Sequence, residues 1–129
     1  MSICRGDIFH SNAFTFVDHG KFFAILGEDS NNVYGCFFIN SDINRYLYLK
    51  PKMLELQVGL GPDEYPFLKH NSYINCAQII KIPKVSLKAD IESGVAKHKG
   101  KLSQADINTI LELVNKSDVF SDADKEFFQ

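Results

Sequence analysis

Two apolar runs joined by a polar turn decide the fold class of this chain. The first is FFAILG at residues 22–27, the second is VYGCFFIN at Val33–Asn40, and EDSNN at residues 28–32 separates them. Aromatic and β-branched residues favour strands, and a short run of Glu, Asp, Ser and Asn is typical of a turn. We therefore predict an antiparallel β-hairpin. Its nearly continuous apolar runs indicate burial on both faces of a curled sheet.

Further strand-length segments lie on either side of this hairpin, separated by turn signals. Strands are predicted at residues 8–9, 46–49, 54–58, 65–68 and 72–82. Pro51 separates two of these segments, and Pro83 ends the last one. Six or seven short strands at this spacing favour a small closed antiparallel barrel over an open sheet. The barrel is expected to occupy about residues 5–87.

An amphipathic helix at about residues 103–117 is the second expected element. Ser103 is a good N-cap, and Asp106 lies where a carboxylate favours the exposed amides of the first turn. Apolar residues then recur with helical spacing at Ile107, Ile110, Leu111 and Val114. Because such a stripe must be covered, we expect the helix to pack on the barrel. Phe127 and Phe128 are expected either to pack back on the core or to bind a partner.

Length and composition bound the class of protein. A chain of 129 residues, 45% of them hydrophobic, suffices for one core, so we predict a single, mainly β, α+β domain over residues 1–129. Fourteen Lys and Arg against sixteen Asp and Glu give a net charge of −2, which disfavours tight binding to double-stranded DNA. The sequence has no secretory signal and no apolar run of membrane-spanning length, so we expect a soluble, cytoplasmic protein without a membrane partner.

The histidines do not have the spacing of a metal site. None of the four histidines, His10, His19, His70 and His98, is two to five residues from another or from a cysteine. The sequence also lacks a serine-nucleophile motif and a phosphate-binding glycine loop before a helix. We therefore expect neither a metal nor a cofactor. The basic run KHKGK at residues 97–101 is either a phosphate-facing patch or a solvated loop, and the loop is favoured.

Four polar residues lie at the two ends of the hairpin that antiparallel pairing brings together. His19 and Lys21 lie at the start of the first strand, and Asn40 and Ser41 end the second. Imidazole transfers protons near neutral pH, and an ammonium group stabilises the charge of a phosphorane. These groups are the minimum for metal-free RNA cleavage, in which a 2′-hydroxyl attacks the adjacent phosphate. Polar residues are also common at strand ends without any catalytic role, so spacing alone leaves both interpretations open.

Several motifs along the chain occur in an order that resembles one known protein family. RGDIF at residues 5–9 resembles the opening strand of that family, and GKFFAIL at residues 20–26 resembles its Gly-x-Arg-Pro turn and the strand after it. Three later segments, INS at residues 39–41, SYINCAQI at residues 72–79 and KGKLS at residues 99–103, are similar to further family motifs. Together these motifs cover most of residues 5–116, and their order resembles that of the PemK/MazF-like toxins of bacterial toxin–antitoxin systems.

The resemblance implies a divergent SH3-like barrel that forms a homodimer and cleaves single-stranded RNA without a metal. It also implies an antitoxin protein as a partner. Lys21 stands where the family has a catalytic arginine, which keeps the charge without the planar fork that fits a phosphate. With the polar set above, the resemblance implies catalytic roles for Lys21, His19 and Ser41. Substrate-binding roles are implied for Asn40, Arg45, His70 and Gln78.

The alternative is a non-catalytic barrel that binds a protein or peptide partner through aromatic side chains. The chain has eleven Phe and five Tyr, an acidic net charge and no arginine at the position that the family uses for catalysis. The candidate contacts are Phe14, Phe16, Tyr46, Tyr48 and Phe67. Aromatic residues at strand spacing are more often core than interface, so this alternative depends on their exposure.

Overall fold

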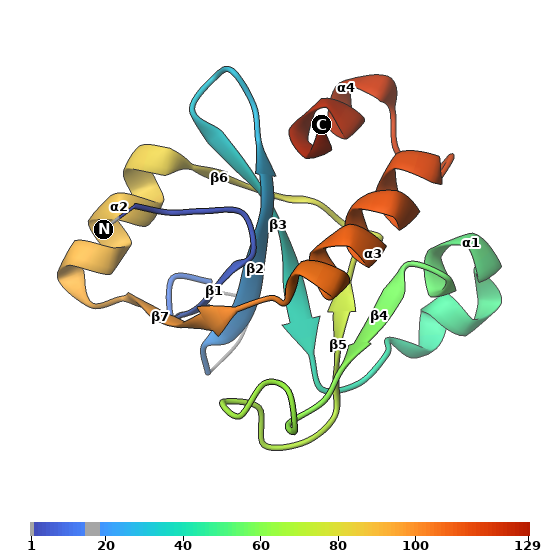
Figure 1. The fold of residues 1–129 in the computed structure, drawn as a ribbon, viewed down its shortest axis with the longest axis horizontal. Coiled ribbons are helices and arrows are strands. Elements are labelled where there is room, and N and C mark those ends of the chain that lie inside the picture. The colour runs from blue at the N-terminus through green and yellow to red at the C-terminus, as the bar shows by residue number, and fades with distance from the viewer. Residues whose placement is uncertain (1, 15–18) are drawn as a thin grey trace.

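The computed structural model describes residues 2–14 and 19–129, which form a curled antiparallel sheet with helices against it (Figure 1). The strands are β1 (Asp7–Ser11), β2 (Lys21–Glu28), β3 (Val33–Asn40), β4 (Gln57–Leu60), β5 (Ser72–Asn75), β6 (Ile80–Pro83) and β7 (Ala96–Lys101). The α-helices are α1 (Pro51–Leu54), α2 (Lys84–Ser93), α3 (Gln104–Lys116) and α4 (Asp122–Lys125), and the 3-10 helices are η1 (Arg45–Leu49) and η2 (Glu126–Phe128). The fold class is α+β, as the sequence predicts.

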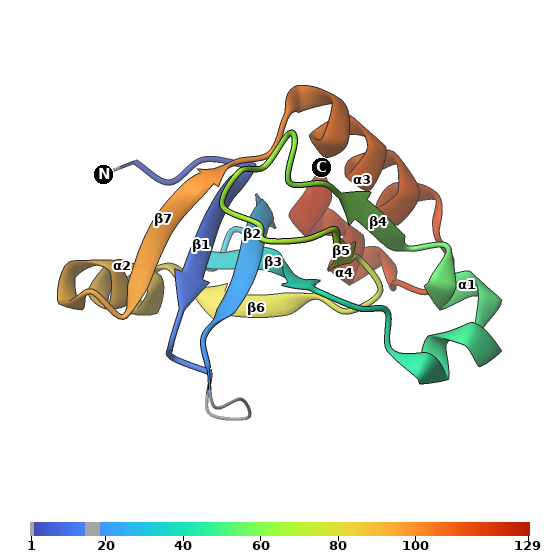
Figure 2. The same cartoon turned by 90° about the horizontal axis from the view of Figure 1, so that it is seen from below.

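The sheet is open, so the predicted closed barrel is wrong. Its strand order is β4-β5-β3-β2-β1-β7, and all of its pairs are antiparallel. Strand β3 is long enough to pair with β6 along its first half and with β5 at its end. Among the described residues β4 and β7 do not pair with each other. Helix α3 follows β7 directly and runs beside β4 (Figure 2), and its apolar residues contribute to the core there.

The predicted hairpin of β2 and β3 is confirmed, and so is its burial on both faces. Ala24 and Leu26 lie in one core together with residues of α3, whereas Phe23 and Ile25 lie in a second core with Leu87 of α2. Successive side chains of a strand point to opposite faces, so a continuous apolar run supplies both cores at once.

The predicted C-terminal helix is confirmed as α3. The Ser103 hydroxyl oxygen accepts a hydrogen bond from the Asp106 N–H at 3.1 Å, which satisfies one exposed amide of the first turn. The buried residues of the helix are Ile107, Ile110 and Val114. Because these three repeat with helical spacing, α3 buries one continuous stripe against the sheet.

The two C-terminal phenylalanines pack back on the core, which is one of the two predicted alternatives. The ring of Phe128 stacks on Phe37 of β3 with centroids 5.3 Å apart. A Cβ atom at Gly27 would lie 1.7 Å from the carbonyl oxygen of Phe127. The close approach of this segment to β2 therefore requires a glycine at position 27.

Three of the predicted strands are wrong for most or all of their length. Residues 46–49 lie in η1, which begins where the Asn44 side chain accepts a hydrogen bond from the Tyr46 N–H at 3.0 Å. Pro51 opens α1, so only the end of the predicted segment 54–58 belongs to a strand, β4. Residues 65–68 form turns instead of pairing. Capping by Asn44 and the helix start at Pro51 decided the first two segments over their aromatic and apolar composition.

The predicted strand at residues 72–82 is two strands, β5 and β6, with a turn at residues 76–79. The Asn75 side-chain oxygen accepts hydrogen bonds from the Ala77 N–H at 3.1 Å and from Gln57 Nε2 at 2.7 Å. The first of these bonds is an Asx-type contact, which favours a turn over a continued ladder.

The sequence did not predict α2 or β7. Only Leu87 of α2 is buried, so the helix has almost no apolar periodicity to recognise. The basic run at residues 97–101, for which a solvated loop was favoured, lies in β7 at the edge of the sheet and pairs with β1. Lysines are typical of edge strands because they prevent pairing with another chain.

No helix among residues 2–14 and 19–129 has the length and apolar composition that crossing a bilayer requires.

Candidate functional site

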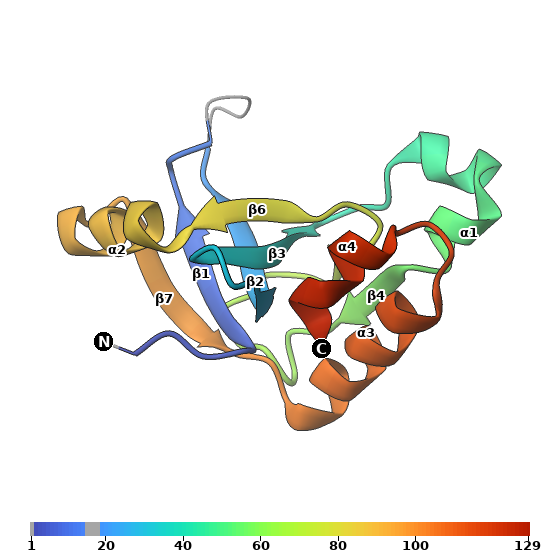
Figure 3. The same cartoon turned by 90° about the horizontal axis from the view of Figure 1, so that it is seen from above.

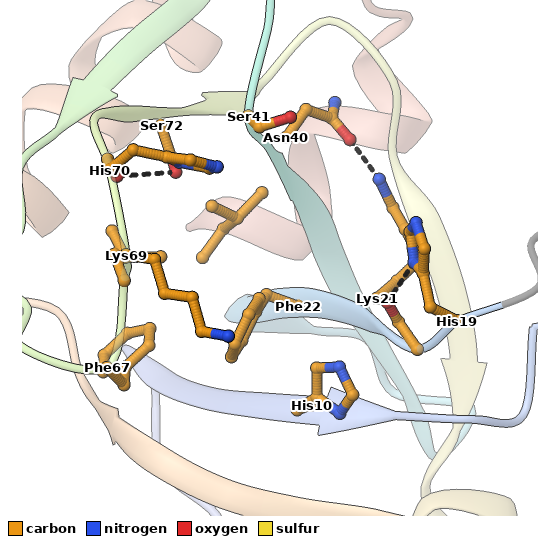
Figure 4. Close-up of a pocket in the computed structure, with 13 residues that line it drawn as sticks. His10, His19, Lys21, Phe22, Asn40, Ser41, Phe67, Lys69, His70 and Ser72 are labelled. Carbon is orange, nitrogen blue, oxygen red and sulfur yellow. Dashed lines mark hydrogen bonds between the residues drawn. The ribbon is translucent and has the colours of Figure 1, made fainter.

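A cavity of about 370 Å³ lies beside the start of β2 and the end of β3, at the open end of the hairpin (Figure 4). Strands β1, β2 and β3, with the residues just before β2 and just after β3, supply one part of its wall. The loop at residues 61–71 and the first residue of β5 supply the rest. Its lining residues are His10, His19, Gly20, Lys21, Phe22, Ile39, Asn40, Ser41, Phe67, Leu68, Lys69, His70 and Ser72. Figure 2 shows how that loop leaves β4, runs toward β1 and β7, and returns to β5.

The register of the hairpin brings the predicted polar residues together. Phe22 lies opposite Ile39, which places Lys21 beside Asn40 at the end of the pair. The ammonium group of Lys21 donates a hydrogen bond to the Asn40 side-chain oxygen. His19 and Ser41 line the same cavity, so all four residues expected at the hairpin ends converge there.

The ammonium group of Lys21 is partly withdrawn from solvent. Burial lowers the pKa of Lys21 from its ordinary value, because water no longer fully solvates the charge. The group lies 5.2 Å from the centre of the Phe38 ring, and its hydrogen-bond partner Asn40 is neutral. An ammonium group whose near partners are an amide and a ring face keeps most of its charge available for an anion.

His10 also lines the cavity, although the sequence did not single it out. Its ring meets the ring of Phe22 edge-on, with centroids 4.7 Å apart. Burial is the main factor that lowers its pKa, and the charge of Lys99 lowers it further, while the nearby Gly20 carbonyl acts in the opposite direction. The neighbouring charges of His19 and Lys97 lower the pKa as well. The ring therefore favours its neutral form more than a solvated histidine does.

His19 lies at the rim of the cavity. It is exposed, and its Nδ1 is 3.1 Å from the carbonyl oxygen of Gly20. The His10 ring packs against the same glycine, so two imidazoles lie beside Gly20 on one side of the cavity. A Cβ atom at this position would lie 2.2 Å from His10 Cε1, so only glycine fits beneath the ring.

The opposite wall comes from the loop at residues 61–71, which carries His70 as predicted and Lys69 in addition. Tyr65 holds this loop against the start of α3. Its hydroxyl oxygen accepts a hydrogen bond from the Ser103 N–H at 3.0 Å, and its hydroxyl group donates one to Asp106. Phe67 of the same loop packs on Phe22 with ring centroids 5.4 Å apart. These contacts place a loop without strand pairing over the sheet.

Two of the predicted site residues lie elsewhere. Arg45 is exposed at the start of η1, and Gln78 is exposed in the turn between β5 and β6. Neither is among the residues that line the cavity. The Gln78 prediction assumed one continuous strand through residues 72–82, and the turn at residues 76–79 removes the geometry on which it rested.

The lining is basic. It contains three histidines and two lysines, and none of its described residues is a carboxylate. Such a cavity attracts an anion, and imidazoles beside it can exchange protons with that anion near neutral pH.

His98, by contrast, lies outside the cavity and contacts the buried Asp7 at 3.2 Å. Within the described residues, no three His, Cys, Asp or Glu side chains are grouped as a metal site would need.

The proposed aromatic binding residues have different environments. Phe14 packs partly buried against the second core, and Phe67 packs against the first. Tyr46 is 76% exposed and Tyr48 is 60% exposed, both on η1, which with α1 projects beyond the end of β3 (Figure 3). Phe16 lies outside the described residues.

No protein-family model matches this chain, and no curated protein matches it significantly.

Proposed function

We propose that this protein is a metal-independent endoribonuclease that cleaves single-stranded RNA. The observation that carries this proposal is the basic cavity, in which Lys21, Lys69 and three histidines surround one space without a carboxylate among the described lining residues. Cleavage of RNA through its own 2′-hydroxyl needs a proton acceptor, a proton donor and positive charge at the phosphate, and it needs no metal. This set of side chains supplies all three.

Each group has a definite place in the proposed reaction. Lys21 binds a non-bridging phosphate oxygen and stabilises the charge that grows during attack. Asn40 orients the Lys21 ammonium group through their hydrogen bond, and Ser41 lies next to it at the substrate. His19, at the rim, is positioned to exchange a proton with the solvent-facing side of the substrate. His70 contacts the substrate from the opposite wall.

A single strand is the substrate that suits this site. The cavity combines the cationic groups with an apolar surface made by Phe22, Ile39, Phe67 and Leu68. Single strands bind proteins through positive charge along the backbone together with stacking of exposed bases on aromatic rings. The net charge of −2 for the whole chain disfavours broad binding to duplexes and leaves the local basic cavity as the main attraction.

The biological setting of the proposal rests on the resemblance to PemK/MazF-like toxins. We propose a partly opened SH3-like sheet that acts as a homodimer in the bacterial cytoplasm, where an antitoxin protein binds and inhibits it. The substitution of lysine for the family's arginine predicts a slower enzyme, because an ammonium group contacts a phosphate as a point charge and not through a bidentate fork.

The direct test is RNA cleavage by the purified protein in the presence of a chelator. Total RNA is incubated with the unchanged chain, with Lys21→Ala and with Lys88→Ala, a matched control on the exposed surface of α2. The proposal expects cleavage by the unchanged chain and by Lys88→Ala, with a large loss for Lys21→Ala. Intact RNA in all three samples, or equal cleavage by all three, contradicts it.

A second candidate function is a non-catalytic module that binds a protein or peptide. The specific observation in its favour is the exposure of Tyr46, Tyr48 and Leu49, the last of which is 83% exposed. Large apolar side chains grouped at the surface are typical of interaction sites. If the protein leaves RNA intact, the product of a reading frame next to its gene is the partner to test. Binding that the double substitution Tyr46→Ala, Tyr48→Ala abolishes would support this function, and unchanged binding would contradict it.

A further inference from the structure

The three histidines of the cavity differ in how firmly they are held. His19 and His70 are exposed, whereas the His10 ring is half-buried between β1 and the segment before β2. Figure 4 shows His10 at the β1 side of the cavity and His70 on the loop across from it. Two imidazoles on separate walls are a suitable arrangement for a reaction that removes one proton and donates another.

His10 is held by two contacts. Its ring lies edge-on to Phe22, with centroids 4.7 Å apart, and it packs against the backbone of Gly20. The missing side chain at position 20 leaves the space that the ring fills, since a Cβ atom there would lie 2.2 Å from His10 Cε1. A neutral imidazole has one nitrogen with a free lone pair, so a ring held in its neutral form at the cavity wall can accept a proton.

The charges around His10 favour the neutral ring. Lys97 and Lys99 approach from β7, and His19 approaches from the segment before β2, and all three lower its pKa together with burial. The same cations attract a phosphate into the cavity. The surroundings that keep His10 neutral thus also bring the substrate to it.

We propose that His10 is the general base of the cleavage reaction and that His70 is the general acid. This inference rests on the proposed function. His10 takes the proton of the 2′-hydroxyl while its oxygen attacks the adjacent phosphorus and the O2′–P bond forms. The P–O5′ bond breaks, and protonated His70 gives its proton to O5′. The products are a 2′,3′-cyclic phosphate and a 5′-hydroxyl end, so atoms and charge balance without a metal or a co-reactant.

The test uses two RNA substrates that differ in one atom at the cleavage site. In the second substrate sulfur replaces O5′, so the leaving group departs as a thiolate without a proton donor. On ordinary RNA, we expect His10→Ala and His70→Ala each to lose about 10²- to 10⁴-fold in cleavage rate. On the sulfur substrate, His70→Ala recovers most of its rate, whereas His10→Ala does not. His98→Gln, a histidine outside the cavity, is the control and should cleave both substrates normally.

Folding is checked separately from catalysis. His10→Gln keeps a polar side chain of similar size at the cavity wall, and binding to an oligonucleotide with a 2′-deoxyribose at the cleavage site reports on an intact cavity. The inference predicts normal binding with lost cleavage for His10→Gln. It is overturned if His10→Gln cleaves as fast as the unchanged chain, or if sulfur substitution restores His10→Ala and not His70→Ala. If the unchanged chain cleaves no RNA, the proposed function itself has failed and the inference fails with it.

Discussion

The ammonium group of Lys21 on β2 donates a hydrogen bond to the side-chain oxygen of Asn40 on β3, across the open end of the hairpin. The pair consists of a cation and a neutral amide, so the bond orients the charge without cancelling it. A basic residue used for structure alone is more often paired with a carboxylate, as Lys84 is with Glu28 at 2.9 Å. The difference between these two lysines is the physical basis for assigning Lys21 to a phosphate.

Changing the partner of Lys21 to an acid should weaken RNA binding. In Asn40→Asp, the new carboxylate neutralises the Lys21 ammonium group and repels phosphate, so we expect the Kd for a single-stranded oligonucleotide to rise by about tenfold or more. Fluorescence anisotropy measures it. The matched control is Asn108→Asp on the exposed face of α3, which adds the same charge away from the cavity. Equal affinity for Asn40→Asp and the control would show that Lys21 does not bind the phosphate.

Stability should depend on pH through His10. Its pKa is lowered in the folded state, so below its unfolded pKa of about 6.5 the unfolded chain binds more protons than the folded chain. The free energy of unfolding therefore falls as the pH drops from about 6.5 toward the folded pKa, below which the loss is complete. His10→Gln should flatten this part of the profile, as measured by urea unfolding at a series of pH values. A profile with an unchanged slope in this range would contradict the assignment.

Removing the hydroxyl of Tyr65 should loosen the loop that carries Lys69 and His70. Tyr65→Phe leaves the Ser103 N–H and the Asp106 carboxylate without this partner, at a cost of about 1–3 kcal/mol in the free energy of unfolding. RNA affinity should also fall, because the loop no longer holds its basic residues at the cavity. The control is Tyr73→Phe, whose hydroxyl has no hydrogen bond to the described residues. Thermal unfolding and oligonucleotide binding measure the two effects, and a Tyr65→Phe variant that matches the control in both would exclude an anchoring role.

A side chain at position 27 should displace the C-terminal segment. The Cβ atom in Gly27→Ala would meet the Phe127 carbonyl oxygen, so we expect a loss of about 1–3 kcal/mol from overpacking and greater exposure of Phe128. Gly59→Ala provides the matched control, because nothing lies within 4 Å of the Cβ position there. Urea unfolding compares the two variants. Similar stabilities would mean that the C-terminal segment does not pack tightly on β2 in solution.

The convergence of Lys21 with Asn40 was predictable because it depends on sequence neighbours alone. Two apolar runs with a short turn between them pair antiparallel, and this pairing fixes which ends meet. The helix stripe of α3 was predictable for a similar reason, since capping and periodicity are local. Ser41 follows Asn40 in the sequence, so the same pairing brings it to the cavity.

The rest of the site depends on contacts between distant parts of the chain. His10 joins the cavity because β1 pairs with β2 in a register that sets His10 opposite Phe22. The alternation of β1, which puts His10 on the same face as Ile8, is the one signal that could have identified it. Lys69 is placed by the contact of Tyr65 with α3, across 38 residues from Ser103, and the sequence has no local pattern for such a contact. Arg45 lies outside the cavity because capping by Asn44 starts a 3-10 helix there instead of a strand. Gln78 lies outside it because the Asn75 side chain favours a turn where a continuous strand was expected.

The most direct measurement is induced expression of the unchanged chain in a bacterium, beside Lys21→Ala, with growth followed and RNA 5′ ends sequenced. The account predicts growth arrest and new RNA fragments with 5′-hydroxyl ends for the unchanged chain, and neither effect for Lys21→Ala. Normal growth with intact RNA, or the same fragments from both chains, would contradict the claim that the cavity at the end of the β2–β3 hairpin cleaves RNA.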